Sequence, residues 1–163
     1  MISVLLLLGG NLGSVEQTFE CVRGDLEREA GEILRSSEIL RSAAWGFQAD
    51  DFLNQAVELL TELGAEELLD VTQGIEERWG RDREAEAQAK LSGGERYCSR
   101  SIDIDIIFYG DAVIESERLT IPHPLMAERE FVLEPLVQIA PHMLHPESGL
   151  SVEQMFNNLK LKS

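Results

Sequence analysis

Two aspartates spaced two residues apart, Asp103 and Asp105, are the residues of this chain best suited to chemistry. They lie in the stretch "RSIDIDIIFYG", which otherwise has the β-branched and aromatic composition of a strand. Side chains alternate along a strand, so both carboxylates should face one side, with Cα atoms about 7 Å apart. The opposite face is expected to carry Ile102, Ile104, Ile106 and Phe108. From spacing alone, the two carboxylates either are simply solvated at the edge of a sheet or hold a cation, and both interpretations stay open.

Basic residues gather just before this stretch. Six of the chain's 14 Lys and Arg residues lie between 78 and 100, although the formal net charge of the chain is −16. Guanidinium groups are the natural partners of phosphate oxygens, and Mg²⁺ takes oxygen ligands that substrate phosphates often complete. Arg81, Arg83 and Arg100 beside the aspartate pair therefore favour a magnesium and phosphate site of the kind that phosphoryl transfer needs.

Three other stretches each have a structural and a functional interpretation. Phe52 and Asn54 share one side of a predicted strand, either as core or as a platform for a flat heterocycle with hydrogen-bonding edges. His123 stands between two prolines in "IPHP", as a structural loop residue or as a donor to a phosphate oxygen. "GGNLGS" follows a strand and opens a helix but lacks the spacing of a phosphate loop, so a tight turn is the better interpretation.

The elements that must position these residues follow in the order β-α-β-β-α-β. Hydrophobic periodicity predicts strands near 3–8, 33–42, 52–63 and 100–110, and helices over 14–29 and 65–79. A short strand near Val113, a short helix over 126–134 and a last helix capped by Ser151 and Gln154 come after them. This order predicts an α+β ferredoxin-like sandwich, an antiparallel sheet with helices on one side.

Composition narrows the class of protein. A chain of 163 residues with 44% hydrophobic residues is expected to form one globular domain over 1–163. The strongly negative charge argues against binding to nucleic acid or to a membrane surface. Cys21 and Cys98 lack metal-ligand spacing, and no membrane span or signal peptide is apparent, so a cytoplasmic location is expected. The chain is also expected to be a monomer.

The order of several motifs carries a resemblance. Glu76, then Gly80-Arg81 with Arg83, then "RSIDIDI", "RLTIPHP" and "ERxFVLxPL" occur as they do in one family. Together with "GGNLGS", "WGFQADDFLN" and "EELLDVTQGIE", they cover about residues 7–146. The chain resembles the 6-hydroxymethyl-7,8-dihydropterin pyrophosphokinases of the folate pathway.

The resemblance implies a ferredoxin-like fold and a one-step transfer of pyrophosphate from ATP to the hydroxymethyl group of the pterin, which releases AMP. It implies two Mg²⁺ ions bound with ATP and held by Asp103 and Asp105. The phosphate-binding arginines would be Arg81 and Arg100. The other ATP contacts would be Gln73, Glu76, Arg83, Arg118, Thr120 and His123. The pterin contacts would be Trp45, Gly46, Phe52, Asn54, Arg129 and Phe131.

The sequence departs from the family pattern in places, and other functions stay open. Gly10 stands where a serine is usual, Cys98-Ser99 replaces a frequent Gly-Pro or Ala-Pro, and the loop over 83–97 is longer than in compact members. One alternative is another Mg²⁺-dependent enzyme on phosphate esters, a nucleotidyl transferase or a phosphatase. A second is a ferredoxin-like small-molecule sensor in which the aspartates are only solvated.

Overall fold

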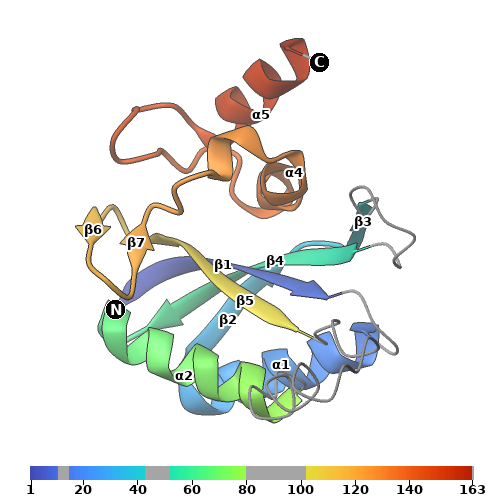
Figure 1. The fold of residues 1–163 in the computed structure, drawn as a ribbon, viewed down its shortest axis with the longest axis vertical. Helices are drawn as coiled ribbons and strands as arrows, with labels where there is room; N and C mark the ends of the chain where they lie inside the picture. The colour runs from blue at the N-terminus through green and yellow to red at the C-terminus, as the bar shows by residue number, and fades with distance from the viewer. Residues whose placement is uncertain (11–14, 43–51, 80–101, 163) are drawn as a thin grey trace, which may run out of the picture.

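An antiparallel sheet forms the centre of the molecule (Figure 1). The computed structural model describes all residues except 11–14, 43–51, 80–101 and 163. The strands pair in the order β2-β4-β1-β5, and the short β3 also pairs with β4. The strands of this sheet are β1 (Ile2–Gly10), β2 (Gly31–Ser36), β3 (Leu40–Ser42), β4 (Phe52–Thr61) and β5 (Asp103–Tyr109). The segment predicted as one strand over 33–42 is therefore two strands, both paired with β4.

The central strand β1 is apolar on both faces because both faces of the sheet are covered. Val4, Leu6 and Leu8 belong to one buried cluster, whereas Leu5 and Leu7 belong to a second cluster on the opposite face. Alternation along the strand separates the two sets. A run of five consecutive apolar residues is what a strand between two layers requires.

Helices cover both faces of the sheet (Figure 1). The helices α1 (Val15–Glu29) and α2 (Ala65–Trp79) lie on one face, and α4 (Glu130–Ile139) and α5 (Val152–Leu161) lie on the other. The prediction of a ferredoxin-like α+β fold is confirmed, with β2 and β3 together in the place of the second predicted strand. The expectation that helices lie on one side only is wrong. It holds for α1 and α2, but Leu5, Leu7 and Ala56 form a second apolar face that the C-terminal helices bury.

A β-bulge in β5 changes the direction of one predicted core residue. The pairing of β1 with β5 shifts between Leu5 and Leu6, so that Leu6 pairs with Ile106 while Leu5 pairs with Phe108. The extra residue, Ile107, restarts the alternation. Phe108 therefore packs with the cluster under α4 and not with Ile104 and Ile106, which corrects the expectation for that residue.

The segment after β5 returns across the sheet to the C-terminal helices. It forms a small hairpin, β6 (Ile114–Glu115) with β7 (Thr120–Ile121), and then the 3₁₀ turn η1 (Met126–Glu128). The single helix predicted over 126–134 is instead η1 and α4, separated by Arg129 in an extended conformation. The predicted capping box of the last helix is present: the Ser151 hydroxyl accepts from the Gln154 amide, and the Gln154 side chain accepts from the Ser151 amide.

No helix in the described part of the chain is both long enough and apolar enough to cross a membrane.

Candidate active site

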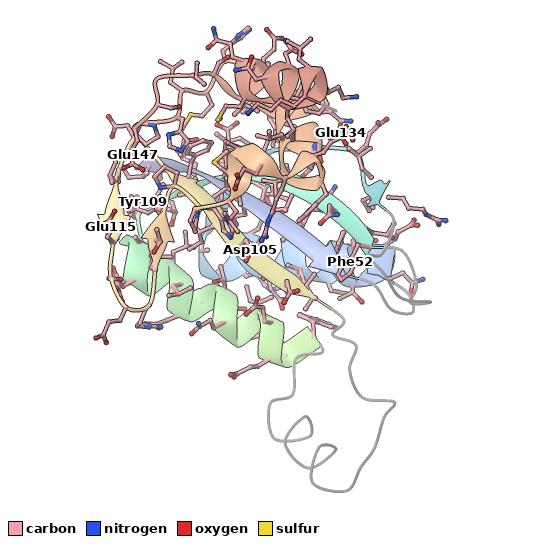
Figure 2. The ribbon with its side chains drawn as sticks, turned by 45° about the horizontal axis from the view of Figure 1, so that its top comes forward. Phe52, Asp105, Tyr109, Glu115, Glu134 and Glu147 are labelled. Atoms are coloured by element: carbon pink, nitrogen blue, oxygen red, sulfur yellow. The ribbon has the colours of Figure 1, made fainter. Side chains whose placement is uncertain are left out.

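Asp103 and Asp105 share one face of β5, as the period of the strand predicts. The Ile104 between them is 5% exposed on the opposite face, whereas Asp105 is exposed and Asp103 is half-buried. Figure 2 labels Asp105 on β5, below the segment that leads into α4. The two carboxylates therefore project from the core into a region that water and a ligand can reach.

The donors at this face suit a hard cation. In the described part of the chain, no group of three or more His, Cys, Asp or Glu residues could hold a metal ion by itself. An ion at the aspartate pair would therefore take its remaining oxygen ligands from water and from a substrate. That division of ligands, with one or two carboxylates from the protein, is typical of Mg²⁺.

Asn54 lies in the same cross-strand row as Asp103, with a glycine between them. Gly9 of β1 pairs with Asp103 on one side and with Asn54 on the other. Asn54 is 4% exposed, and an ideal Cβ on residue 9 would lie 3.2 Å from its Oδ1 atom. The missing side chain leaves bare backbone between the carboxylate and the amide. A flat ligand could lie there against the sheet.

The next row toward the C-terminal helices is closed. There Leu7 pairs with Asp105 and with Ala56, and both apolar residues are buried in the cluster that α4 and α5 complete. Beyond the row of Gly9, the sheet is thus covered by packed apolar residues. The sequence interpretation of "GGNLGS" as a turn missed this role, because β1 extends to Gly10 and its first glycine faces the aspartate side. The alternation of side chains along the strand could have predicted the direction in which Gly9 faces. The residues that pair with Gly9 could not be predicted from the sequence.

Aromatic residues from two elements border the same face. Phe52, labelled in Figure 2, begins β4 two residues before Asn54. The residue is 38% exposed. Phe131 lies in the first turn of α4, half-buried against the second core cluster. The Phe52 and Phe131 rings do not contact each other in this structure. The two residues predicted to hold the pterin ring therefore lie on separate elements and do not touch.

Arg129 contacts Phe131 at the start of α4, and His123 is hydrogen-bonded to β5. The guanidinium carbon of Arg129 lies 5.7 Å from the centre of the Phe131 ring, within cation–π range. The backbone N–H of His123 donates to the Ile107 carbonyl oxygen at 3.1 Å, which fastens the segment after β7 onto the bulge of β5.

The electrostatics of His123 reflect both neighbours. Burial lowers the pKa of His123, the charge of Asp105 opposes that change, and the charge of Arg129 adds to it, so the net pKa is lowered. The imidazole is therefore neutral at pH 7, and one of its nitrogens carries a proton that it can donate. Its Nδ1 atom is buried and has no hydrogen-bond partner within the described residues.

Some of the predicted nucleotide contacts form a second group on α2 and the β6-β7 hairpin. Arg118, between β6 and β7, donates to Asp70 at 2.5 Å and to Gln73 at 3.4 Å, both on α2. Its hydrogen bond with Asp70 and the charges of Asp70 and Glu66 raise the pKa of Arg118. Thr120, also predicted to contact ATP, lies exposed in β7. The structure therefore brings Gln73 and Arg118 together.

Glu76 has a different position from the one expected of a nucleotide contact. It is 6% exposed on the inner side of α2, and its Oε2 atom accepts a hydrogen bond from the backbone N–H of Ile104 at 2.8 Å. That oxygen is therefore hydrogen-bonded to the backbone of β5. Contact between Glu76 and ATP stays a prediction.

Five predicted site residues lie outside the described residues: Trp45, Gly46, Arg81, Arg83 and Arg100.

The fold and this face define a ferredoxin-like α+β protein with a carboxylate pair and an adjacent aromatic and amide surface. The sequence model of the 7,8-dihydro-6-hydroxymethylpterin-pyrophosphokinase family matches residues 5–141. The chain belongs to this family. In folate biosynthesis, its members transfer pyrophosphate from ATP to the hydroxymethyl pterin, so the predicted family and reaction are confirmed at that level.

Similar proteins occur in different organisms. The chain is 39% identical over 153 residues to a 2-amino-4-hydroxy-6-hydroxymethyldihydropteridine pyrophosphokinase of Synechocystis, covering 93% of this chain and 73% of the relative. A Porphyromonas gingivalis enzyme of the same name is 37% identical over 150 residues, covering 91% of this chain and 97% of the relative.

The solved structures support the fold. The crystal structure of wild-type Plasmodium falciparum HPPK-DHPS matches with a TM-score of 0.70 at 15% identity, covering 96% of this chain and 44% of the other. This chain thus spans less than half the length of that protein. At such low identity, the likeness supports the fold alone.

Proposed function

We propose that this chain transfers pyrophosphate from ATP to the hydroxymethyl group of 6-hydroxymethyl-7,8-dihydropterin in a Mg²⁺-dependent reaction that releases AMP. The observation that carries the proposal is the row formed by Asp103, Gly9 and Asn54. It puts a carboxylate for the phosphate chemistry and an amide for ring recognition on either side of bare backbone.

In this reaction the pterin hydroxyl oxygen forms a bond to the β-phosphorus of ATP, and the bond from that phosphorus to the oxygen bridging to the α-phosphate breaks. AMP leaves, and the hydroxyl proton is lost. Two Mg²⁺ ions bound with ATP would be held by Asp103 and Asp105 and would offset the negative charge of the triphosphate. Positioning and charge neutralisation supply most of the catalysis in transfers of this kind.

Asn54 and the two phenylalanines would bind the pterin. The Asn54 amide offers both a carbonyl oxygen and an NH₂ group, which match the mixed donors and acceptors on the edge of a pterin. Phe52 and Phe131 offer apolar ring faces on separate elements, so a planar ring can lie between them. Arg129, with its guanidinium over the Phe131 ring, would border the same ligand. Trp45 and Gly46 stay predicted pterin contacts.

Arg118, Gln73, Thr120 and His123 would bind ATP on the side of α2 and the β6-β7 hairpin. The two acidic groups beside Arg118 hold its guanidinium on the exposed surface of α2 next to Gln73. The neutral His123 would donate its N–H to a phosphate oxygen without adding charge. Arg81, Arg83 and Arg100 stay predicted phosphate contacts.

The proposal further includes a single domain over residues 1–163 that acts as a cytoplasmic monomer. Its support is compositional. The formal net charge of −16 would repel nucleic acids and anionic lipid surfaces, and Cys21 and Cys98 do not have the spacing of a metal site.

Product analysis tests the function. The protein is incubated with ATP, Mg²⁺ and the hydroxymethyl dihydropterin, and the nucleotides are separated by chromatography. AMP and pterin diphosphate in equal amounts are expected, with neither formed when the pterin is omitted. ADP as the only nucleotide product would exclude pyrophosphate transfer, and inorganic phosphate released from simple esters without a pterin would indicate a phosphatase.

A further inference from the structure

We propose that Glu76 is a positioning residue that holds the backbone between Asp103 and Asp105, and so fixes the direction in which both carboxylates point. The observation is the hydrogen bond from the Ile104 N–H to Glu76 Oε2 at 2.8 Å. The functional part of the inference rests on the proposed use of the two aspartates for Mg²⁺ and phosphate.

The place of β5 in the sheet explains why an anchor is needed. β5 is the outermost strand in the order β2-β4-β1-β5, so only one of its edges pairs with another strand of that sheet. In an antiparallel ladder, successive residues direct their N–H and C=O groups alternately toward the partner strand and away from it. The Ile104 N–H points to the open edge and to α2. The amides of Asp103 and Asp105 then face β1.

The side chain of Glu76 is charged but lies at a position where the core favours an apolar residue. The buried positions of α2 are Leu68, Thr72, Ile75 and Glu76. Ile75 belongs to the same apolar cluster as Ile102 and Ile104, so the carboxylate borders the core. Burying a charged group there costs free energy that an apolar side chain would not cost. An apolar side chain could not accept a hydrogen bond from the outward-facing N–H of Ile104, whereas a carboxylate accepts a strong one.

A loose strand at this point would disrupt the proposed site. Because side chains alternate, a slip of one residue would turn the aspartates toward the core and the isoleucines toward the ligand. Regular pairing of β5 with β1 runs from Asp103 to Ile106, where the bulge at Ile107 interrupts it. The contact from α2 falls within this four-residue stretch. It therefore stabilises the register where the two carboxylates depend on it.

Three variants separate the possible roles of Glu76. Glu76→Gln keeps an oxygen that can accept the hydrogen bond but removes the charge, and Glu76→Ala removes both. Glu77→Ala is the matched control, because Glu77 is the exposed neighbour on the same helix. Three quantities are measured on the full chain: exchange of the Ile104 amide hydrogen by NMR, the Mg²⁺ concentration that gives half-maximal AMP formation, and pterin affinity by calorimetry.

A positioning role has a distinctive outcome. Glu76→Ala should exchange the Ile104 amide about tenfold faster and require about tenfold more Mg²⁺, with pterin affinity unchanged. Glu76→Gln should keep most of the protection of the Ile104 amide, because its side-chain oxygen can accept the same hydrogen bond, and Glu77→Ala should stay near the wild-type values in all three measurements. The wild-type Ile104 amide should itself be protected from exchange, a result that is available even if Glu76→Ala does not fold.

Two results would overturn the inference. An Ile104 amide that exchanges in the wild type as fast as an exposed amide would show that the anchor does not hold in solution. Equal loss of activity in Glu76→Gln and Glu76→Ala would assign the effect to the charge of Glu76 and not to the hydrogen bond. Failure of the wild type to form AMP would refute the proposed function instead, and amide exchange would still decide whether Glu76 anchors β5.

Discussion

Gly9 and Asn54 face each other across β1 and β4, so close that a single added methyl group would press on the amide. The Cβ of an alanine at residue 9 would lie 3.2 Å from Asn54 Oδ1. Contacts that short force the neighbouring group to move, and the Asn54 side chain is buried and cannot move freely. The lack of a side chain at residue 9 therefore lets the Asn54 amide keep its position in the proposed pterin site.

We expect Gly9→Ala to weaken pterin binding about tenfold or more, because the added methyl group displaces the Asn54 amide. ATP affinity should be unchanged. Calorimetry with each ligand separately measures both effects. Gly24→Ala on α1 is the control, since its Cβ would approach only the flexible guanidinium of Arg28, at 3.4 Å. Wild-type pterin affinity in a folded Gly9→Ala protein would place the ring elsewhere.

Asp103→Asn and Asp105→Asn should each lower turnover about a hundredfold, because an amide cannot replace a carboxylate as a ligand that neutralises a divalent cation. Chelation of Mg²⁺ with EDTA should abolish AMP formation, and added Mg²⁺ should restore it. Asp111→Asn, an exposed aspartate just after β5, should have no effect. Normal rates in both site variants would leave the pair as a solvated edge of the sheet.

The positions of Phe52 and Phe131 predict that their substitution affects the affinity for pterin but not the affinity for ATP. Phe52→Ala and Phe131→Ala should weaken pterin binding by about 1 kcal/mol or more, since each removes one ring face, and should leave ATP binding intact. Phe156→Ala is a matched control, because Phe156 also carries a cation over its ring, with Lys160 Nζ 5.0 Å away, but lies on α5. Equal losses of pterin and ATP affinity would indicate a general disturbance of the fold.

Asp25 predicts a pH-dependent contribution to stability. It is 3% exposed on α1 and accepts hydrogen bonds from Trp79 Nε1 at 2.6 Å, from Arg78 at 2.8 Å and from Arg28. Burial raises the pKa of this carboxyl, but the three hydrogen bonds lower it by more, so its pKa in the folded state lies below the ordinary value. The charged form of Asp25 is therefore favoured by folding.

Asp25→Asn should lower the free energy of unfolding by about 2 kcal/mol at pH 7, because the ion pairs of Asp25 with Arg78 and Arg28 are lost. A depressed pKa stabilises the fold above the unfolded pKa, about 3.9, and that contribution disappears as pH falls through the folded pKa. Urea denaturation should thus show the gap between wild type and Asp25→Asn at pH 7 and its narrowing below about pH 4. A gap that stays constant with pH would argue against the charged network.

Several features of the fold could be predicted from local sequence. The bounds of α2 follow from the spacing of Leu68, Thr72, Ile75 and Trp79, and the structure places the helix at Ala65–Trp79. The common face of Asp103 and Asp105 follows from the period of a strand. These features depend only on residues near each other in the chain, so one segment contains the whole signal.

Other features depend on partners distant in the chain. The bulge that turns Phe108 toward α4 arises from the pairing of β5 with β1, about a hundred residues earlier, and nothing in "IDIDIIFYG" marks it. The role of Gly9 likewise depends on which residues of β4 and β5 lie beside it, and the buried position of Glu76 depends on the packing of α2 against the open edge of β5.

The sequence by itself determined the family, the order of the elements and the face of the carboxylate pair, because periodicity and motif order are written along the chain. Only the tertiary structure decided that Gly9 makes room for the Asn54 amide, that Glu76 accepts a hydrogen bond from Ile104, and that helices cover both faces of the sheet. The physical reason is register: strand pairing and helix packing join residues that no local pattern relates, and these contacts decide which side chains meet.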